Sequence, residues 1–230
     1  MPERDTTHGF ILLCALPPEA LAARIGLGRA ARRGAGSARS GSASAGRGEV
    51  RFAGMGPLRA RKAAARLASS LPDDVPVVVL GVGGALVRGF EAGDLVLASA
   101  LGRADAVSGG DLNVVNPPVP LDPRSLELTE RLRDALSARF ASTVAAPLLS
   151  AGRTARGPER AALGKAGAVI CDTESFWLSR LAERRPFAVV RAIVDTPERE
   201  LVSLQTVTGG VKGLARLADA AEIIAGCLSA

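Results

Sequence analysis

Short apolar runs alternate with helix-like segments along the chain, and this alternation constrains the fold more than any other feature of the sequence. Residues 10–15, 75–80 and 187–193 are almost continuously apolar, as strands in the interior of a sheet are. Between them lie segments whose apolar residues recur three or four positions apart, such as 58–70 and 123–140. Strands separated by helices form a sheet that is covered on both faces. We therefore predict an α/β fold of three layers, with residues 1–230 forming a single domain.

The other predicted elements follow from the same patterns and from the glycines and prolines that bound them. Residues 102–122 are predicted to be irregular, because Gly109-Gly110 and Pro117-Pro118 mark turns. Further strands are predicted at 50–53, 94–101, 143–150 and 168–171, and further helices at 18–25, 158–166, 174–184 and 211–224.

The positive charge of the chain is concentrated in one segment. There are 29 Lys and Arg against 23 Asp and Glu, and six of the basic residues lie between 24 and 47, where there is no acid. Residues 28–48 contain only Gly, Arg, Ala and Ser, so we predict a flexible loop there. The remainder is neutral, and aromatic residues make up only 3% of the chain, which argues against a nucleic-acid partner. The loop is either a solvated linker or a peripheral contact with an anionic membrane surface.

Histidine and cysteine usage excludes two kinds of site. His8 is the only histidine, which argues against a His-based catalytic triad or a His-rich metal site. Cys14, Cys171 and Cys227 are scattered, with no CxxC pair, as is typical of buried thiols in a reducing compartment. We therefore predict a cytoplasmic protein without a metal or redox cofactor.

Carboxylates directly follow three of the predicted apolar strands. In α/β folds the ligand crevice lies at the carboxyl ends of the strands, which selects Glu19, Glu174 and Asp195. Glu174 either binds the vicinal hydroxyls of a ribose, or accompanies a helix N-cap at Asp172 or Thr173. Asp195 is either a general acid in the crevice or part of a surface turn.

Two glycine-rich segments also follow strands. Gly81-Val82-Gly83-Gly84 allows the backbone to approach a ligand closely, or simply forms a tight turn between strands. It does not fit a dinucleotide fingerprint, because Leu86 stands where the third glycine is needed. Gly54-Met55-Gly56-Pro57 opens a helix, and its free N–H groups with Arg59 and Arg61 either bind an anion such as phosphate or form a plain helix entry.

These segments occur in an order that resembles the nucleoside phosphorylase and nucleosidase superfamily. Within it, GMGP followed by an Ala/Arg-rich helix is similar to the hopanoid-associated phosphorylase subgroup. The resemblance implies a phosphorylase-like fold with a mixed central sheet. It rests on ALPPEA at 15–20, AGMGPLRA at 53–60, GVGGAL at 81–86, GDLVLASA at 93–100, ICDTES at 170–175 and RAIVDT at 191–196.

The resemblance implies a role for each matching residue. Glu19 would orient or deprotonate the attacking water, and Asp195 would donate a proton to N7 of a purine. Glu174 would bind the ribose hydroxyls. Thr173 and the segment Gly81, Val82, Gly83 and Gly84 would line the nucleoside, and Gly56 with Arg59 would hold phosphate or water. The chemistry needs no cofactor, although phosphorolysis would use phosphate as a co-substrate.

The implied activity is cleavage of the N-glycosidic bond of a purine nucleoside, by hydrolysis or phosphorolysis. Adenine would be released from a 5′-modified adenosine, with adenosylhopane of hopanoid biosynthesis as the first candidate. The alternatives are methylthioadenosine, adenosylhomocysteine or futalosine-type substrates, and a non-catalytic nucleoside-binding protein. Thr173 replaces the usual Met, Val82 a frequent Ser, and no stacking Phe follows Ser150. The resemblance also implies a homo-oligomer.

Overall fold

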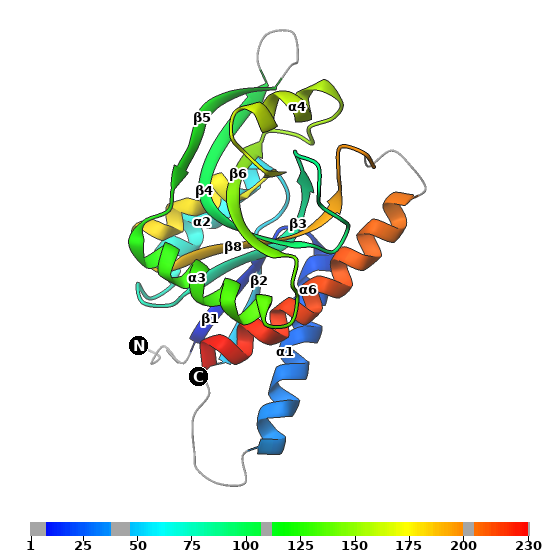
Figure 1. The fold of residues 1–230 in the computed structure, drawn as a ribbon. Coiled ribbons are helices and arrows are strands. Elements are labelled where there is room, and N and C mark those ends of the chain that lie inside the picture. Colours follow the sequence, from blue (N-terminus) through cyan, green and yellow to red (C-terminus); the bar gives the residue numbers. More distant parts are fainter. Residues whose placement is uncertain (1–7, 38–46, 107–111, 200–204, 230) are drawn as a thin grey trace.

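A computed structural model describes residues 8–37, 47–106, 112–199 and 205–229. They form an eight-stranded sheet in the order β2-β1-β3-β7-β6-β4-β5, with β8 pairing with β3 and β4 off this path (Figure 1). The strands are β1 (His8–Cys14), β2 (Arg47–Phe52), β3 (Val77–Ala85), β4 (Leu95–Ala106), β5 (Leu112–Pro120), β6 (Thr143–Ala151), β7 (Ile170–Asp172) and β8 (Phe187–Asp195). The helices are α1 (Pro17–Ser37), α2 (Pro57–Ser70), α3 (Pro123–Ser137), α4 (Pro158–Lys165), α5 (Ser175–Leu178), the 3₁₀ helix η1 (Ser179–Glu183) and α6 (Gln205–Ser229).

The sheet is mixed, as the resemblance implied. Strand β1 is parallel to β2 and β3, and β3 is parallel to β8. Strand β6 is parallel to β4 and β7. The antiparallel pairs are β3 with β7, β4 with β5, and β4 with β8.

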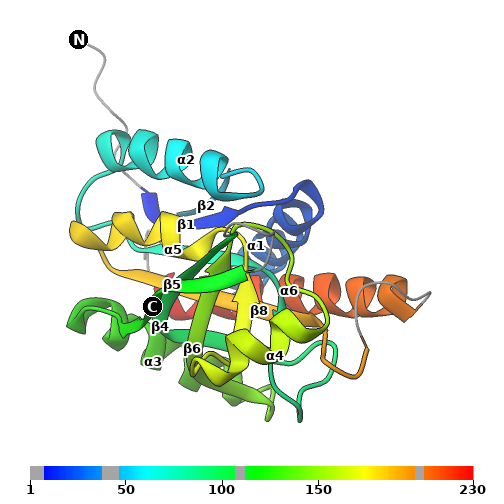
Figure 2. The same ribbon diagram turned by 90° about the horizontal axis from the view of Figure 1, so that it is seen from above.

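Helices cover both faces of the sheet and give three layers (Figure 2). Along β3, Val77 and Val79 pack in the core beneath α2 and α5, whereas Val78 and Leu80 pack in the core beneath α1, α3 and α6. Successive side chains of a strand point to opposite faces, so a strand with two covered faces is apolar at every position. The predicted α/β fold is therefore confirmed, and the continuous apolar runs have this cause.

Helix α1 is longer than the sequence predicted. It continues to Ser37, so the predicted loop is wrong over residues 28–37, and residues 38–46 lie outside the described part. Helix α6 stabilises the extension through two ion pairs, Arg29 with Asp219 at 2.9 Å and Arg33 with Glu222 at 2.8 Å. Tertiary contact with α6 thus overrides the weak helix propensity of a Gly- and Ser-containing segment.

Two other local predictions are wrong for the same kind of reason. Residues 102–106 continue β4 and residues 112–120 form β5, because the two strands pair with each other. Residues 81–84 form no turn, because β3 runs through them in parallel register with β8 as far as Gly84. The helix predicted at 174–184 divides into α5 and η1.

The described helices include none with the length and apolar character that crossing a bilayer requires.

Candidate active site

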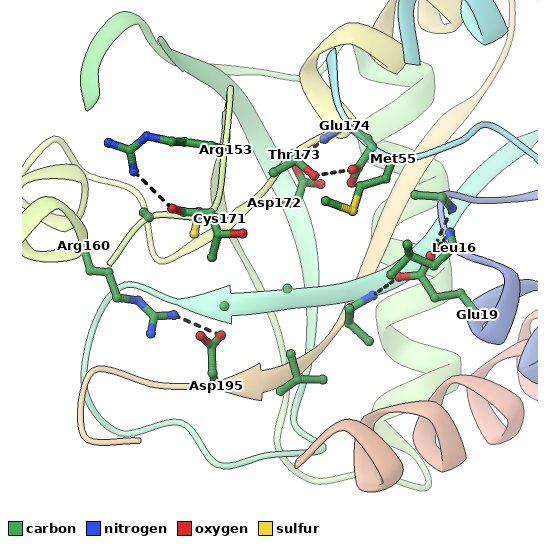
Figure 3. A pocket seen from close by; sticks show the side chains of 17 residues that line it. Leu16, Glu19, Met55, Arg153, Arg160, Cys171, Asp172, Thr173, Glu174 and Asp195 are labelled. Carbon is green, nitrogen blue, oxygen red and sulfur yellow. Dashed lines mark hydrogen bonds and ion pairs between the residues drawn. The ribbon is translucent and has the colours of Figure 1, made fainter. Parts of the chain in front are cut away.

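A pocket of about 260 Å³ opens where β1, β3, β7 and β8 end (Figure 3). Glu19, Glu174 and Asp195 all line it, so the fold brings together the three carboxylates predicted from the sequence. Glu19 lies at one end, Asp195 at the other, and Glu174 above the space between them (Figure 3). The other lining residues are Ala15, Leu16, Met55, Val82, Gly83, Gly84, Arg153, Thr154, Ala155, Arg160, Cys171, Asp172, Thr173 and Val194.

Glu19 is held in place by three backbone N–H groups. It stands in the first turn of α1 and is only 2% exposed. Oε2 accepts hydrogen bonds from the N–H groups of Ala15 at 3.0 Å and Leu16 at 2.8 Å. Oε1 accepts one from Val82 of β3 at 2.8 Å. Two strand ends and a helix start therefore fix the carboxylate at the pocket wall.

Arg191 is a buried cation beside Glu19 that the sequence analysis did not select. Its side chain lies behind Gly81, which leaves the room for it: a Cβ at Gly81 would be 2.1 Å from Arg191 Nη1 and 2.7 Å from Glu19 Oε1. Arg191 is fully buried, and its Nη1 has no hydrogen-bond partner within the described ranges. Gly81 itself does not line the pocket, contrary to prediction, and instead makes space for these two charged groups.

Asp172 shapes the turn that presents Glu174. Its Oδ2 accepts hydrogen bonds from Arg191 Nε at 2.9 Å and Nη2 at 2.5 Å, and its Oδ1 accepts one from Ser150 Oγ at 2.5 Å. The backbone N–H groups of Glu174 and Ser175 also donate to Asp172, at 3.2 Å each. The N-cap position of α5 is Glu174, not Asp172 or Thr173 as one interpretation of the sequence had it, although Asp172 accepts from the N–H groups at the start of that helix. The bonds of Asp172 to Arg191 connect this turn to β8.

Glu174 is a buried carboxylate whose surroundings raise its pKa. Oε1 accepts hydrogen bonds from Gly56 N–H at 3.0 Å and from the Thr173 hydroxyl, and Oε2 lies 3.7 Å from Arg191 Nη2. Burial raises the pKa of Glu174, the charge of Asp172 raises it further, and Arg191 opposes both effects.

The structure does not place the residues of the predicted anion site, Gly56 and Arg59, in the pocket. Gly56 N–H already donates to Glu174, and neither Gly56 nor Arg59 lines the pocket. Arg59 is exposed and folds over Gly54, where an added Cβ would be 2.8 Å from its Cδ. The glycines of this segment serve the turn, since Gly54 and Gly56 have φ of +82° and +88°.

The Asp195 end of the pocket contains a second buried arginine that the sequence did not indicate. Arg160 of α4 is 2% exposed, and its Nη2 lies 3.0 Å from Asp195 Oδ1. Its Nη1 donates to the Thr196 carbonyl at 3.2 Å. Gly84 leaves the room for this pair, since a Cβ there would be 2.4 Å from Arg160 Nη2 and 2.5 Å from Asp195 Oδ1.

The rest of the lining is mainly small or apolar. Leu16 and Met55 lie towards the Glu19 end (Figure 3), and Val82 is next to Glu19, to which its N–H donates. Ala155 and Val194 are further apolar lining residues. No aromatic side chain is among the lining residues of the described part of the chain. Burial raises the pKa of the Cys171 thiol to about 12, so this thiol is neutral at physiological pH.

A sequence model of the phosphorylase superfamily matches residues 11–221. The chain belongs to the phosphorylase superfamily. This confirms the family indicated by the ordered motifs and, with it, the class of enzyme, the nucleosidases and nucleoside phosphorylases. Among curated proteins there is no significant match to this superfamily member.

Solved structures share the superfamily fold over almost the whole chain. Futalosine hydrolase of Helicobacter pylori strain 26695 is similar with a TM-score of 0.69 and 14% identity, covering 94% of this chain and 96% of that one. The 5′-methylthioadenosine/S-adenosylhomocysteine nucleosidase of Neisseria meningitidis, in complex with methylthio-immucillin-A, has a TM-score of 0.69 and 17% identity, covering 94% and 98%. The corresponding nucleosidase of Helicobacter pylori, with butyl-thio-DADMe-Immucillin-A, has a TM-score of 0.70 and 14% identity, covering 94% and 96%.

Proposed function

We propose that this superfamily member hydrolyses the N-glycosidic bond of a 5′-modified purine nucleoside. The observation that carries the proposal is the placement of the three carboxylates in one pocket, with Glu19 and Asp195 at opposite ends and Glu174 between them (Figure 3). Cleavage passes through an oxocarbenium-like state, which needs a proton on the leaving group and a nucleophile on the opposite face of the sugar.

Each carboxylate has a distinct task in this reaction. Asp195 protonates N7 of the purine, so that the base leaves as a neutral molecule. Glu19, which lines the pocket and is fixed by three backbone N–H groups, orients the attacking water and takes its proton. Glu174 accepts hydrogen bonds from the ribose hydroxyls, next to Thr173. The family usually has a methionine at the position of Thr173. In this chain Met55 contributes the apolar surface near the sugar instead.

The electrostatics at the Glu19 end favour water over phosphate. Arg191 carries the positive charge there, and it is already faced by Asp172, Glu174 and Glu19. A phosphate dianion would meet an excess of negative charge, and the Gly56 N–H group that could bind it donates to Glu174. Hydrolysis then needs no cofactor or co-substrate other than water.

We propose adenosylhopane as the nucleoside, on the basis of the resemblance to the hopanoid-associated subgroup. Met55 lines the pocket and is 52% exposed, and Phe52 and Leu58 nearby in the chain are exposed as well, which suits a large apolar 5′ group. The similarity to futalosine hydrolase and to methylthioadenosine/adenosylhomocysteine nucleosidases supports smaller 5′ groups as the second candidate.

The predicted oligomeric state, cellular location and membrane contact of the enzyme are proposals as well. We propose a homo-oligomer, which would also cover exposed apolar residues such as Phe52 and Leu58, and which sedimentation equilibrium tests.

A cytoplasmic location is supported by three free cysteines. Peripheral contact with anionic lipid is proposed for residues 28–48, whose basic residues are Arg29, Arg32, Arg33, Arg39 and Arg47. Liposome sedimentation of an Arg32→Gln/Arg39→Gln variant tests it.

The deciding experiment is base release in phosphate-free buffer and in buffer with phosphate. We expect free adenine from 5′-methylthioadenosine or adenosylhopane at equal rates in both buffers, detected by chromatography. Asp195→Asn should slow release by about 10²- to 10⁴-fold, as loss of a general acid does. Strict dependence on phosphate would refute hydrolysis. Tight nucleoside binding in calorimetry without any base release would instead identify a non-catalytic binding protein.

A further inference from the structure

Arg160 is the pocket residue whose presence the proposed chemistry does not yet explain. It lies in the first turn of the short helix α4, far in sequence from β8, yet its guanidinium is buried between the two elements. Two of its nitrogens are engaged, by Asp195 Oδ1 and by the Thr196 carbonyl. Its Nε has no hydrogen-bond partner within the described ranges.

Burial of the Arg160–Asp195 ion pair is unfavourable for the stability of the fold. Taking a guanidinium and a carboxylate out of water is unfavourable, and apolar side chains of similar volume often replace such pairs without loss of stability. The pair also requires a glycine at position 84, because any side chain there would overlap both charged groups. A structural role for the pair is therefore a weak explanation, whereas its location in the pocket points to chemistry.

The other charged groups near Asp195 do not compete for this role. Arg153 at the same end of the pocket is half-exposed and bound to Glu159 at 2.5 Å. Asp172 is held by Arg191 on the other side of the pocket. The Cys171 thiol, whose pKa burial raises to about 12, carries no charge. Arg160 is therefore the buried cation in contact with Asp195 within the described part of the chain.

We propose that Arg160 is the positioning residue of the acid Asp195, a role that rests on the proposed function. It fixes Oδ1, so that the orientation of the carboxyl group toward the base is set before substrate binds. When the O–H bond of Asp195 breaks and the N7–H bond forms, the electron pair of the C1′–N9 bond passes to the purine, and Asp195 becomes a carboxylate. Arg160, already 3.0 Å from Oδ1, stabilises that new charge without rearrangement. The attacking water bonds to C1′ and transfers its proton to Glu19.

Two substrates with different leaving groups test this role. Purine release needs proton donation, whereas 4-nitrophenol leaves a riboside as a stable anion without it. We expect Arg160→Met to lower kcat for 5′-methylthioadenosine about 10²-fold with KM little changed. Cleavage of 4-nitrophenyl β-D-riboside should keep almost its full rate. Arg160→Lys, which retains the charge, should recover part of the purine rate.

The controls separate failure of this role from failure of the proposed function. Arg156→Met removes the same charge from an exposed residue of the loop that precedes α4; Arg156 does not line the pocket, so both rates should stay unchanged. Equal slowing of both substrates by Arg160→Met, or no slowing of either, would overturn the role of Arg160 alone. Two outcomes require a second comparison: Arg160→Met does not fold, or the wild type does not cleave 4-nitrophenyl β-D-riboside. In either case the kcat and KM of Arg160→Gln for the purine nucleoside are compared with those of Arg160→Lys. Equal values for the two variants overturn the role. A wild type that releases no purine overturns the proposed function itself.

Discussion

Replacing Gly81 by alanine tests whether the charged groups behind β3 are held as rigidly as their contacts indicate. The new methyl carbon would be 2.1 Å from Arg191 Nη1, where ordinary contact begins at 3.4 Å, so the guanidinium must move by about 1.3 Å. Asp172 holds that guanidinium through two hydrogen bonds, so it has little freedom to move. Overpacking costs about 1–3 kcal/mol and a weakened hydrogen bond to a charged group about 1.5–3 kcal/mol. We expect the free energy of unfolding to fall by about 3 kcal/mol. This is less than the sum of the two upper values, because movement of the guanidinium relieves overpacking and weakens its hydrogen bonds at the same time.

Thermal unfolding and base release measure the two consequences separately. A loss of about 3 kcal/mol in a chain of this size lowers Tm by roughly 6–12 °C. Base release should fall with it, since Glu19 Oε1 would be 2.7 Å from the same methyl carbon. Gly226→Ala is the matched control: nothing lies within 4 Å of its added Cβ in α6, so its stability should stay the same or rise by up to about 1 kcal/mol. A Gly81→Ala protein with unchanged Tm and activity would refute the packing argument.

Three further predictions follow from the buried groups. The pKa of Glu174 is raised on folding, so the folded chain binds the extra proton. The unfolding free energy of the wild type should therefore fall relative to Glu174→Gln as pH rises above about 4.5, measured by urea titration between pH 4 and 7; a constant difference would contradict this. Burial raises the pKa of Cys14 and Cys171 to about 12, so at pH 8 a thiol reagent should label Cys227 in the native protein and all three thiols after unfolding. Rapid labelling of all three in the native state would count against the packing. Arg191→Met should lower the unfolding free energy by about 3–5 kcal/mol, because it leaves buried carboxylates without their cation; an unchanged denaturation midpoint would show that these carboxylates do not need it.

The carboxylates of the site could be found from the sequence because their positions are a local property. Glu19, Glu174 and Asp195 each follow a strand that the apolar pattern marks. Strands β1, β3 and β8 are parallel, so the strands before Glu19 and Asp195 end at one edge of the sheet, whereas Glu174 follows β7, which is antiparallel to β3. Of the residues predicted with them, Thr173, Val82, Gly83 and Gly84 line the pocket. Gly81, Gly56 and Arg59 do not, and each is a position where a contact distant in sequence decides the outcome.

The two buried arginines carried no comparable local signal. Arg160 stands in a short helix between Glu159 and Ala161, and Arg191 stands inside an apolar strand. Arginine in a short helix at the surface of a sheet is usually exposed. The one clue to Arg191 is its position at the centre of a run whose neighbours are buried, where a charge needs a partner. Its partner Asp172 comes from a different strand, so the pairing depends on sheet order.

The sequence by itself determined the class of fold, because a strand with two covered faces must be apolar throughout and a covering helix must be amphipathic. It also determined which edge of the sheet carries the carboxylates. Only the tertiary structure decided that 81–84 is a strand, that α1 reaches Ser37, and that two glycines make room for Arg191 and Arg160. These outcomes depend on pairing and charge contacts between segments far apart in the chain. Such contacts leave no periodic pattern in the sequence around either partner.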